Sequence, residues 1–286
     1  MTFKKLCSLL LLTTATLSVQ AASVWKVSSD KHTLYIGGTI HILSPEDYPL
    51  PREYDIAYKA ADKVVFETDM IEANSLEFQQ KMMAKLVYSD GTTIDKVLKA
   101  ETYAALKQHM EERNVPIAAM ATLKPSLIAI TLSIMELQAL GFTSEGVDQF
   151  YANKSQVDGK PQSWFETPDE QIDFIVNLGK EDESGMIDYA IKDIKKLPEI
   201  INAMRDSWRE GDMQAMADVS IDDFKADYPQ IYQDLLVERN NNWLPKIEGM
   251  LHDQAVELIL VGGLHLAGPD SVLAKLAAKG YKIEKL

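Results

Sequence analysis

Two short stretches at opposite ends of the chain share one pattern, and this pattern constrains the fold more than any other feature. "LYIGGTIH" (34–41) and "ELILVGGLHLAG" (257–268) each run from a strand-like segment into two glycines and then a histidine. Glycines at a strand end remove Cβ atoms, so that another group can approach the backbone closely or the chain can turn at positive φ. If the two strands are neighbours in one sheet, His41 and His265 converge at its edge.

The segments that flank these stretches alternate between strand and helix. The N-terminal part is expected to fold as strand, strand, helix, strand: "VWKVSS", "TLYIGG", "REYDIAYKAADK", "KVVFETD". The C-terminal part is expected to fold as helix, strand, helix, strand: "NNWLPKIEGMLHD", "VELILVGG", "PDSVLAKLAAKG" (opened by Pro269-Asp270), "YKIEKL". This alternation indicates an α/β protein whose central mixed or parallel β-sheet is built from N- and C-terminal βαβ segments.

The middle of the chain, roughly 72–240, is predicted to be mainly helical, because its apolar residues recur at three- and four-residue spacing. One strand-like interruption reaches Glu166, and Thr167 and Pro168 are suited to the N-cap and first position of the helix that follows. No low-complexity linker divides the chain. We therefore expect a single domain over 22–286 that contains a helical insertion.

The first 21 residues have the layout of a secretory signal peptide. Lys4 and Lys5 precede an apolar run, and Val19-Gln20-Ala21 is a small-residue exit, so cleavage after Ala21 is expected. A retained N-terminal anchor is the alternative. Cleavage predicts a periplasmic or secreted protein with no stable membrane span, because no later segment is apolar over eighteen residues.

Composition excludes several classes of site and partner. The one cysteine, Cys7, lies within the predicted signal peptide, which leaves no thiol for disulfides, nucleophilic catalysis or Cys-ligated metals. Without Lys4 and Lys5, 27 of the 29 basic residues remain against 43 acidic ones. No dense basic run survives, so nucleic acid is not an expected partner. The chain also lacks the GxSxG, P-loop and GxGxxG motifs.

Acidic residues at the ends of two strands complete a candidate site. Glu67 and Asp69 follow the apolar strand "KVVF" on one face, Asp69 being the better helix cap and Glu67 the better site residue. Glu166 holds the analogous place after "SWF". Two histidines with one or two carboxylates suit Zn, Mn, Fe or Co. The other three histidines and three of the four tryptophans are interpreted as structural: His32, His109, His252, Trp164, Trp208, Trp243.

Several stretches taken together resemble the TraB/GumN family, which is similar to the Tiki metalloproteases and more distantly to erythromycin esterases and ChaN-like haem-binding proteins. They are, in chain order, "LYIGGTIHIL", "ADKVVFETD", "GVDQFYANK…WFETPDEQ", "ERNNNW" and "LILVGGLHLAGPDSVLAKLAAKGYKI". A lone GxxH is a weak signal, whereas five stretches in register over the whole mature chain are a strong one.

The resemblance implies roles for particular residues. The two GxxH motifs and the acidic residue of the family correspond to His41, His265 and Glu67, which would hold a divalent metal (Mn, Co or Zn). The Glu-Thr element of the family corresponds to Glu166-Thr167, and Glu166 would be an alternative ligand or general base. The Arg-Asn pair of the family corresponds to Arg239 and Asn240.

Arg239 would act on a carboxylate or a developing oxyanion, or else form a helix salt bridge with Glu238 or another acid. Asn240 would bind substrate or cap the following helix. The implied activity is metal-dependent hydrolysis of a peptide or a small amide or ester, and the alternative is a haem-, metal- or peptide-binding protein without turnover.

Overall fold

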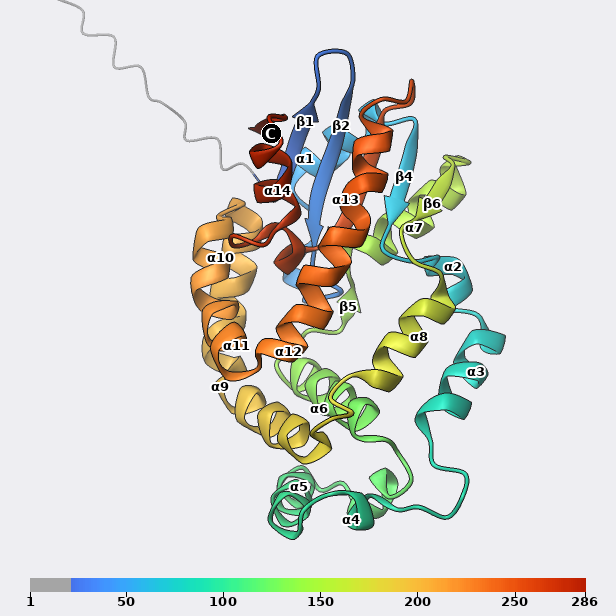
Figure 1. Ribbon diagram of the computed structural model, residues 1–286, viewed down its shortest axis with the longest axis vertical. Coiled ribbons are helices and arrows are strands. Elements are labelled where there is room, and N and C mark those ends of the chain that lie inside the picture. The colour runs from blue at the N-terminus through green and yellow to red at the C-terminus, as the bar shows by residue number, and fades with distance from the viewer. Residues whose placement is uncertain (1–21) are drawn as a thin grey trace, which may run out of the picture.

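The computed structural model describes residues 22–286, so the predicted signal peptide lies outside the described residues. A six-stranded sheet forms the upper half of the molecule in the order β6-β4-β7-β2-β1-β8 (Figure 1). Its strands are β1 (Val24–Ser28), β2 (Thr33–Thr39), β4 (Lys63–Phe66), β6 (Gln162–Trp164), β7 (Glu257–Gly262) and β8 (Lys282–Lys285). A separate two-stranded sheet pairs β3 (Ile42–Leu43) with β5 (Ser144–Glu145).

Strand β7, from the C-terminal part of the chain, lies between two strands from the N-terminal part. It pairs in parallel with β2 on one side and with β4 on the other, and β4 pairs in parallel with β6. Only β1 runs antiparallel to its two neighbours, β2 and β8, so the sheet is mixed. The predicted α/β class is confirmed, and the parallel strands all end at the same edge.

Helices cover both faces of this sheet. On one face α1 (Arg52–Ala60) and α7 (Val147–Asp158) bury a core that includes Tyr54 and Tyr151 against β4 and β7. On the other face α13 (Arg239–Met250) and α14 (Val272–Ala278) bury Trp243 and Leu276 against β2 and β7. Because β7 is buried on both sides, its sequence is a nearly continuous apolar run.

The helical middle region lies below the sheet edge (Figure 1). Its helices α4, α5, α6 and α9, with the turn η2, enclose an apolar core of their own that includes Leu106, Ile128 and Ile191. The elements of this region are α2 (Met70–Ala73), α3 (Leu76–Leu86), α4 (Ile94–Val97), α5 (Ala100–Glu112), η2 (Ile117–Met120), α6 (Pro125–Ala139), α8 (Pro168–Asn177), α9 (Glu183–Glu210), α10 (Met213–Ser220), α11 (Asp222–Asp227), α12 (Pro229–Tyr232) and η3 (Gln233–Glu238). No helix among residues 22–286 combines the length and apolar character needed to cross a bilayer.

Helix starts agree with the sequence at two positions and differ at a third. Asp69 caps α2 by accepting from the backbone N–H groups of Ile71 and Glu72 at 3.0 Å each. Thr167 caps α8 with Pro168 in its first turn. The prediction that Pro269-Asp270 opens the last helix was wrong, because the Ser271 hydroxyl accepts from Ala274 N–H and α14 begins at Val272.

Candidate active site

The two Gly-Gly-His stretches lie side by side, because β2 and β7 pair with Thr39 opposite Gly262. Gly37 is required by close packing, since a Cβ there would lie 2.9 Å from Leu260 Cδ2 and 3.0 Å from Tyr54 Cε1. The carbonyl of Gly38 accepts hydrogen bonds from Trp208 Nε1 (2.8 Å) and the Tyr54 hydroxyl. The packing at Gly37 and the hydrogen bonds to Gly38 therefore fix the end of β2. The loop that follows carries His41 to the sheet edge.

Gly262 lies at the centre of the candidate site. A Cβ at this position would be 3.3 Å from Glu67 Oε1, 3.6 Å from His265 Cδ2 and 3.7 Å from His41 Nε2. Its backbone N–H donates to Glu67 Oε1 at 2.6 Å. The missing side chain gives room for the close approach of Glu67, whereas the distances to His265 and His41 are ordinary van der Waals contacts.

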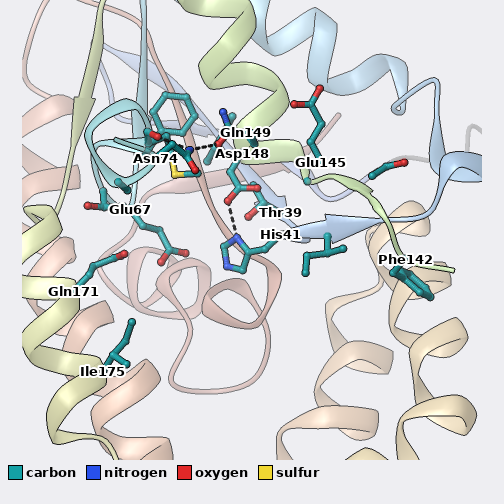
Figure 2. A pocket seen from close by; sticks show the side chains of 18 of the residues that line it. Thr39, His41, Glu67, Asn74, Phe142, Glu145, Asp148, Gln149, Gln171 and Ile175 are labelled. Atoms are coloured by element: carbon teal, nitrogen blue, oxygen red, sulfur yellow. Dashed lines mark hydrogen bonds and ion pairs between the residues drawn. The ribbon is translucent and has the colours of Figure 1, made fainter. Parts of the chain in front are cut away.

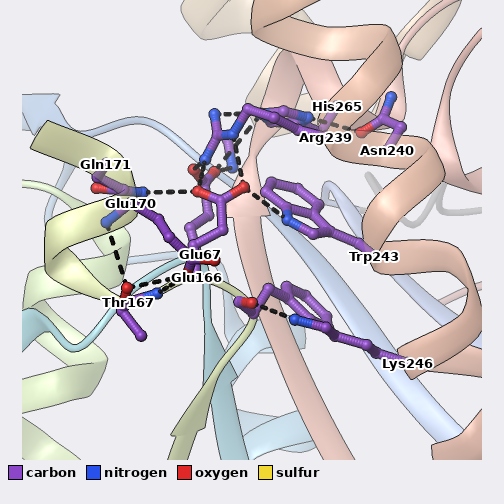
Figure 3. Close-up of polar contacts among 12 residues, drawn as sticks. Glu67, Glu166, Thr167, Glu170, Gln171, Arg239, Asn240, Trp243, Lys246 and His265 are labelled. Atoms are coloured by element: carbon purple, nitrogen blue, oxygen red, sulfur yellow. Dashed lines mark hydrogen bonds and ion pairs between the residues drawn. The ribbon is translucent and has the colours of Figure 1, made fainter. Parts of the chain in front are cut away.

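Arg239 connects the acidic residues of the site (Figure 3). Its Nε and Nη2 donate to the two oxygens of Glu166 at 2.8 Å each, and Nη2 also donates to Glu67 Oε2 at 2.7 Å. The turn η3, a short π-helix, joins α12 to α13 directly before Arg239. Short π-helical turns are frequent at functional sites.

His265 has a defined tautomer. Its Nδ1 lies 2.7 Å from Asn240 Oδ1, and its Nε2 lies 3.2 Å from Arg239 Nη1. Because arginine only donates, Nε2 accepts and Nδ1 carries the proton that is donated to Asn240. Trp243 packs against both side chains, with its ring centroid 4.4 Å from that of His265 and 4.8 Å from Arg239 Cζ, and its Nε1 donates to Glu166 at 2.8 Å.

His41 lies on the opposite wall and is held by a residue of α7. Its Nδ1 is 2.6 Å from Asp148 Oδ2, and the Glu67 carboxylate points toward the imidazole ring (Figure 2). The side chain of His41 is 63% exposed, whereas that of Asp148 is only 10% exposed. Both line a cavity of about 660 Å³ together with Glu67 and Arg239.

Charges in the site depend strongly on burial and neighbours. Burial opposes the negative charge of Glu67, but Arg239, His265 and His41 outweigh it and lower the pKa of this carboxyl to about 2. Burial lowers the pKa of His265 to about 3. The Asp148 carboxylate raises the pKa of His41 to about 9. Near neutral pH the site therefore holds an ionised Glu67, a neutral His265 and a protonated His41.

The donors that would hold a divalent metal agree with metal chemistry in type and orientation. Both imidazoles are anchored through Nδ1 by an oxygen acceptor, which leaves Nε2 facing the site, the usual arrangement of metal-bound histidines. The positions of these side chains, however, do not form a complete metal site. Among residues 22–286 no three or more His, Cys, Asp or Glu side chains lie close enough together to hold an ion as placed, and Arg239 occupies His265 Nε2. Arg239 would therefore have to release this nitrogen before an ion could bind there.

The structure separates the predicted site residues into two groups. His41, Glu67 and Arg239 line the 660 Å³ cavity, and His265 lines a second cavity that shares all three. Glu166 and Asn240 are not among the lining residues of either cavity. Glu166 instead holds Arg239, and Asn240 holds His265 while donating to the Asp270 carbonyl at 3.0 Å. Their described contacts with the site thus run through Arg239 and His265.

Two residues were missed by sequence reasoning. Asp148 lies in the first turn of α7, where an acidic residue is common for dipole reasons alone. Trp243 was interpreted as a packing residue, and it does pack against Phe165, but it also supports the site. Asp148 lies within the quoted stretch "GVDQFYANK" and Trp243 within "ERNNNW". Those two stretches, which contribute to the family resemblance, were the signal in the sequence that could have pointed to Asp148 and Trp243.

Comparison with known proteins gives one match. No curated protein and no solved structure matches the chain. The model of the TraB/PrgY/gumN family matches residues 23–285, which is nearly all of the described structure. The match includes both Gly-Gly-His stretches, Glu67, Glu166 and the Arg239-Asn240 pair. The chain therefore belongs to the TraB/PrgY/gumN family.

Proposed function

We propose that the protein is a metal-dependent hydrolase acting on a peptide or a small amide or ester outside the cytoplasm. The observation that carries this proposal is the convergence of His41, His265 and Glu67 around Gly262 at the carboxyl ends of parallel strands. This edge is where α/β sheets bind ligands. The adjoining cavity of about 660 Å³ has room for a small substrate.

His41, His265 and Glu67 would hold the ion, which we expect to be Mn, Co or Zn. When bound, a divalent ion would supply a Lewis acid that makes water nucleophilic near neutral pH. Glu67 is better suited to hold it than to act as a general base, because a carboxyl with a pKa of about 2 is a weak base. His41 would have to lose its proton first, so binding of the ion should release a proton.

Arg239 would stabilise negative charge that develops on the substrate carbonyl oxygen. It lines the cavity, and the pairing with Glu166 fixes the plane of its guanidinium group. Asn240 and Glu166 then act as positioning residues, the first for His265 and the second for Arg239. The burial of this network excludes water from the ion pairs, which strengthens them.

The test uses four variants with Mn, Co and Zn supplied in turn. His41→Ala, His265→Ala and Glu67→Gln should lose both metal and peptide or ester cleavage while melting near the wild-type temperature. Arg239→Ala should keep the metal and lose about 10²–10³ in kcat. His252→Ala, which removes an exposed histidine, is the matched control. Cleavage that survives the three ligand changes would overturn the proposal.

A second candidate function is a binding protein without turnover, holding haem, a metal or a peptide. The low pKa values of Glu67 and His265 favour it, because neither group is a competent base near neutral pH. A Soret band in the absorbance of the purified protein would indicate bound haem. Metal binding without cleavage of any substrate would indicate a metal-binding role.

A further inference from the structure

A second cavity, of about 540 Å³, opens from the candidate active site in a different direction. It shares Thr39, His41, Glu67 and Arg239 with the first cavity and adds His265. A third cavity, of about 520 Å³, continues it away from the sheet edge. These last two cavities share the apolar residues Ile134, Leu197, Met204, Phe224, Leu235 and Leu264, and we call them together the apolar channel.

The first cavity and the apolar channel are lined by different kinds of side chain. The first cavity carries amide and hydroxyl side chains, among them Asn74, Gln149 and Gln171 (Figure 2). The apolar channel is lined near the site by aliphatic residues and methionines, and polar side chains return only at its outer end. There Lys192 and Lys196 pair with acidic residues of α11 at 2.7 and 3.0 Å. A ligand that spans the site would need one polar part and one apolar part.

The walls of the apolar channel favour an alkyl chain over a peptide. The six shared residues come from α6, α9, α11, η3 and the turn η4 (Gly263–Leu266), and the backbone groups of these helices are mostly bonded within them. An extended peptide gains most of its binding from main-chain hydrogen bonds to a strand edge, and none of the six shared residues lies on a strand. Peptide N–H and C=O groups would therefore be buried without partners at a cost of about 1–3 kcal/mol each. An alkyl chain has no such groups.

Thr39 marks the junction of the polar cavity and the apolar channel. Its side chain lines both, it is 3% exposed, and Oγ1 has no hydrogen-bond partner among the described residues. A buried hydroxyl without a protein partner is uncommon, and this one is free to donate to a group bound at the junction. A carbonyl oxygen placed at this junction would accept its hydrogen bond.

We infer that the substrate is an acylated amphiphile whose aliphatic acyl chain lies in the apolar channel and whose polar part lies in the first cavity. Its ester or amide carbonyl would lie beside Thr39, Glu67 and Arg239. Water adds to the carbonyl carbon, the C–O or C–N bond breaks, and the leaving oxygen or nitrogen takes a proton, so that a carboxylic acid and an alcohol or amine are formed. The cleavage rests on the proposed hydrolase function, whereas the binding of the chain does not.

The first experiment measures binding without turnover. N-acyl alanine amides from acetyl to tetradecanoyl are titrated into the wild-type protein without added metal, below their micelle concentrations, by calorimetry. Affinity should rise up to about fourfold for each added methylene, as expected for burial of alkyl surface. Affinity that is independent of chain length would overturn the inference, as would equally tight binding of unacylated apolar peptides.

Two substitutions test where the acyl chain of the ligand lies. Ile134→Asp places a charge in the apolar channel and should remove the dependence on chain length. Leu140→Asp is the matched control, since Leu140 directly follows the same helix, is 37% exposed against 36% for Ile134, and lines neither part of the apolar channel. Leu197→Trp should shorten the longest chain that still adds affinity. An Ile134→Asp protein that melts normally and keeps the wild-type chain-length series would contradict this placement.

The outcomes distinguish the two proposals. Chain-dependent binding with no cleavage of acyl esters or amides under any metal would support the apolar channel and refute the hydrolase. Cleavage of short esters or peptides with no effect of chain length on binding would support the hydrolase and refute the acyl chain.

Discussion

Asp148 Oδ2 lies 2.6 Å from Nδ1 of His41, although 107 residues separate the two positions in the chain. This contact fixes the His41 ring so that Nε2 faces Glu67 and Gly262. It also determines the charge of the ring, because the Asp148 carboxylate is the largest cause of the raised His41 pKa. The orientation and the protonation of one site residue thus depend on a helix that contributes no proposed ligand.

Asp148→Asn should lower the pKa of His41 from about 9 toward its ordinary value of 6.5, because the amide cannot stabilise the imidazolium charge. Above pH 9, where the ring is neutral in both proteins, the same change should weaken metal binding by about 10–100-fold, the usual cost of losing a ligand's supporting carboxylate. Proton NMR titration of the histidine ring and metal titration measure the two effects. Glu145→Gln, at another residue of the same cavity, is the control. An unchanged His41 pKa would refute the role of Asp148.

Gly262→Ala should impair the site more than the fold. The backbone φ of Gly262 is −49°, which alanine adopts without strain, but the new methyl group would lie 3.3 Å from Glu67 Oε1. Overpacking of this kind costs about 1–3 kcal/mol, which displacement of Glu67 would relieve. We expect lost metal binding and activity with a modest fall in melting temperature. Gly249→Ala, where a methyl meets nothing within 4 Å, is the control. Full activity in Gly262→Ala would contradict the convergence at this residue.

Glu166→Gln should lower kcat while the metal remains bound. Glu166 makes a paired contact to Arg239 at 2.8 Å through both oxygens, and an amide cannot accept both bonds or balance the charge. Breaking one side of a buried ion pair costs about 3–5 kcal/mol when the remaining charge is unpaired, and Glu67 still pairs with Arg239, so we expect a smaller loss of stability. Glu238→Gln, an exposed neighbour of Arg239, is the control. Equal losses in both variants would refute the positioning role.

Glu257→Gln should change how stability depends on pH. Burial raises the pKa of the Glu257 carboxyl, and the Lys63 ammonium 3.1 Å away offsets this only in part. A pKa that is higher in the folded than in the unfolded state gives stability that is complete at low pH and is lost as the pH rises through the folded-state value. The melting temperature of the variant minus that of wild type should therefore be more positive near pH 7 than near pH 4. Glu199→Gln, at an exposed helix position, is the control, and a difference independent of pH would contradict the prediction.

The sequence was sufficient for the sheet strands and for the residues at their ends, because these depend on local alternation and on the direction of parallel strands. Glu67 and His265 were selected as candidate site residues in this way. The contacts among site residues were not predictable, since they join segments far apart in the chain. Nothing local shows that Arg239 binds Glu166, 73 residues earlier, rather than Glu238 beside it. Asn240 could not be assigned either, because the helix expected to start there continues from η3.

The position of β7 between β2 and β4 has a consequence for the order in which the molecule matures. Glu67 finds its hydrogen-bond partner at Gly262 only after 195 further residues have been made. A nascent or truncated chain that ends before residue 257 lacks His265 and the strand that joins the two halves of the sheet. Such a chain cannot form the site, because β7 supplies Gly262, leads into His265 and lies between β2 and β4.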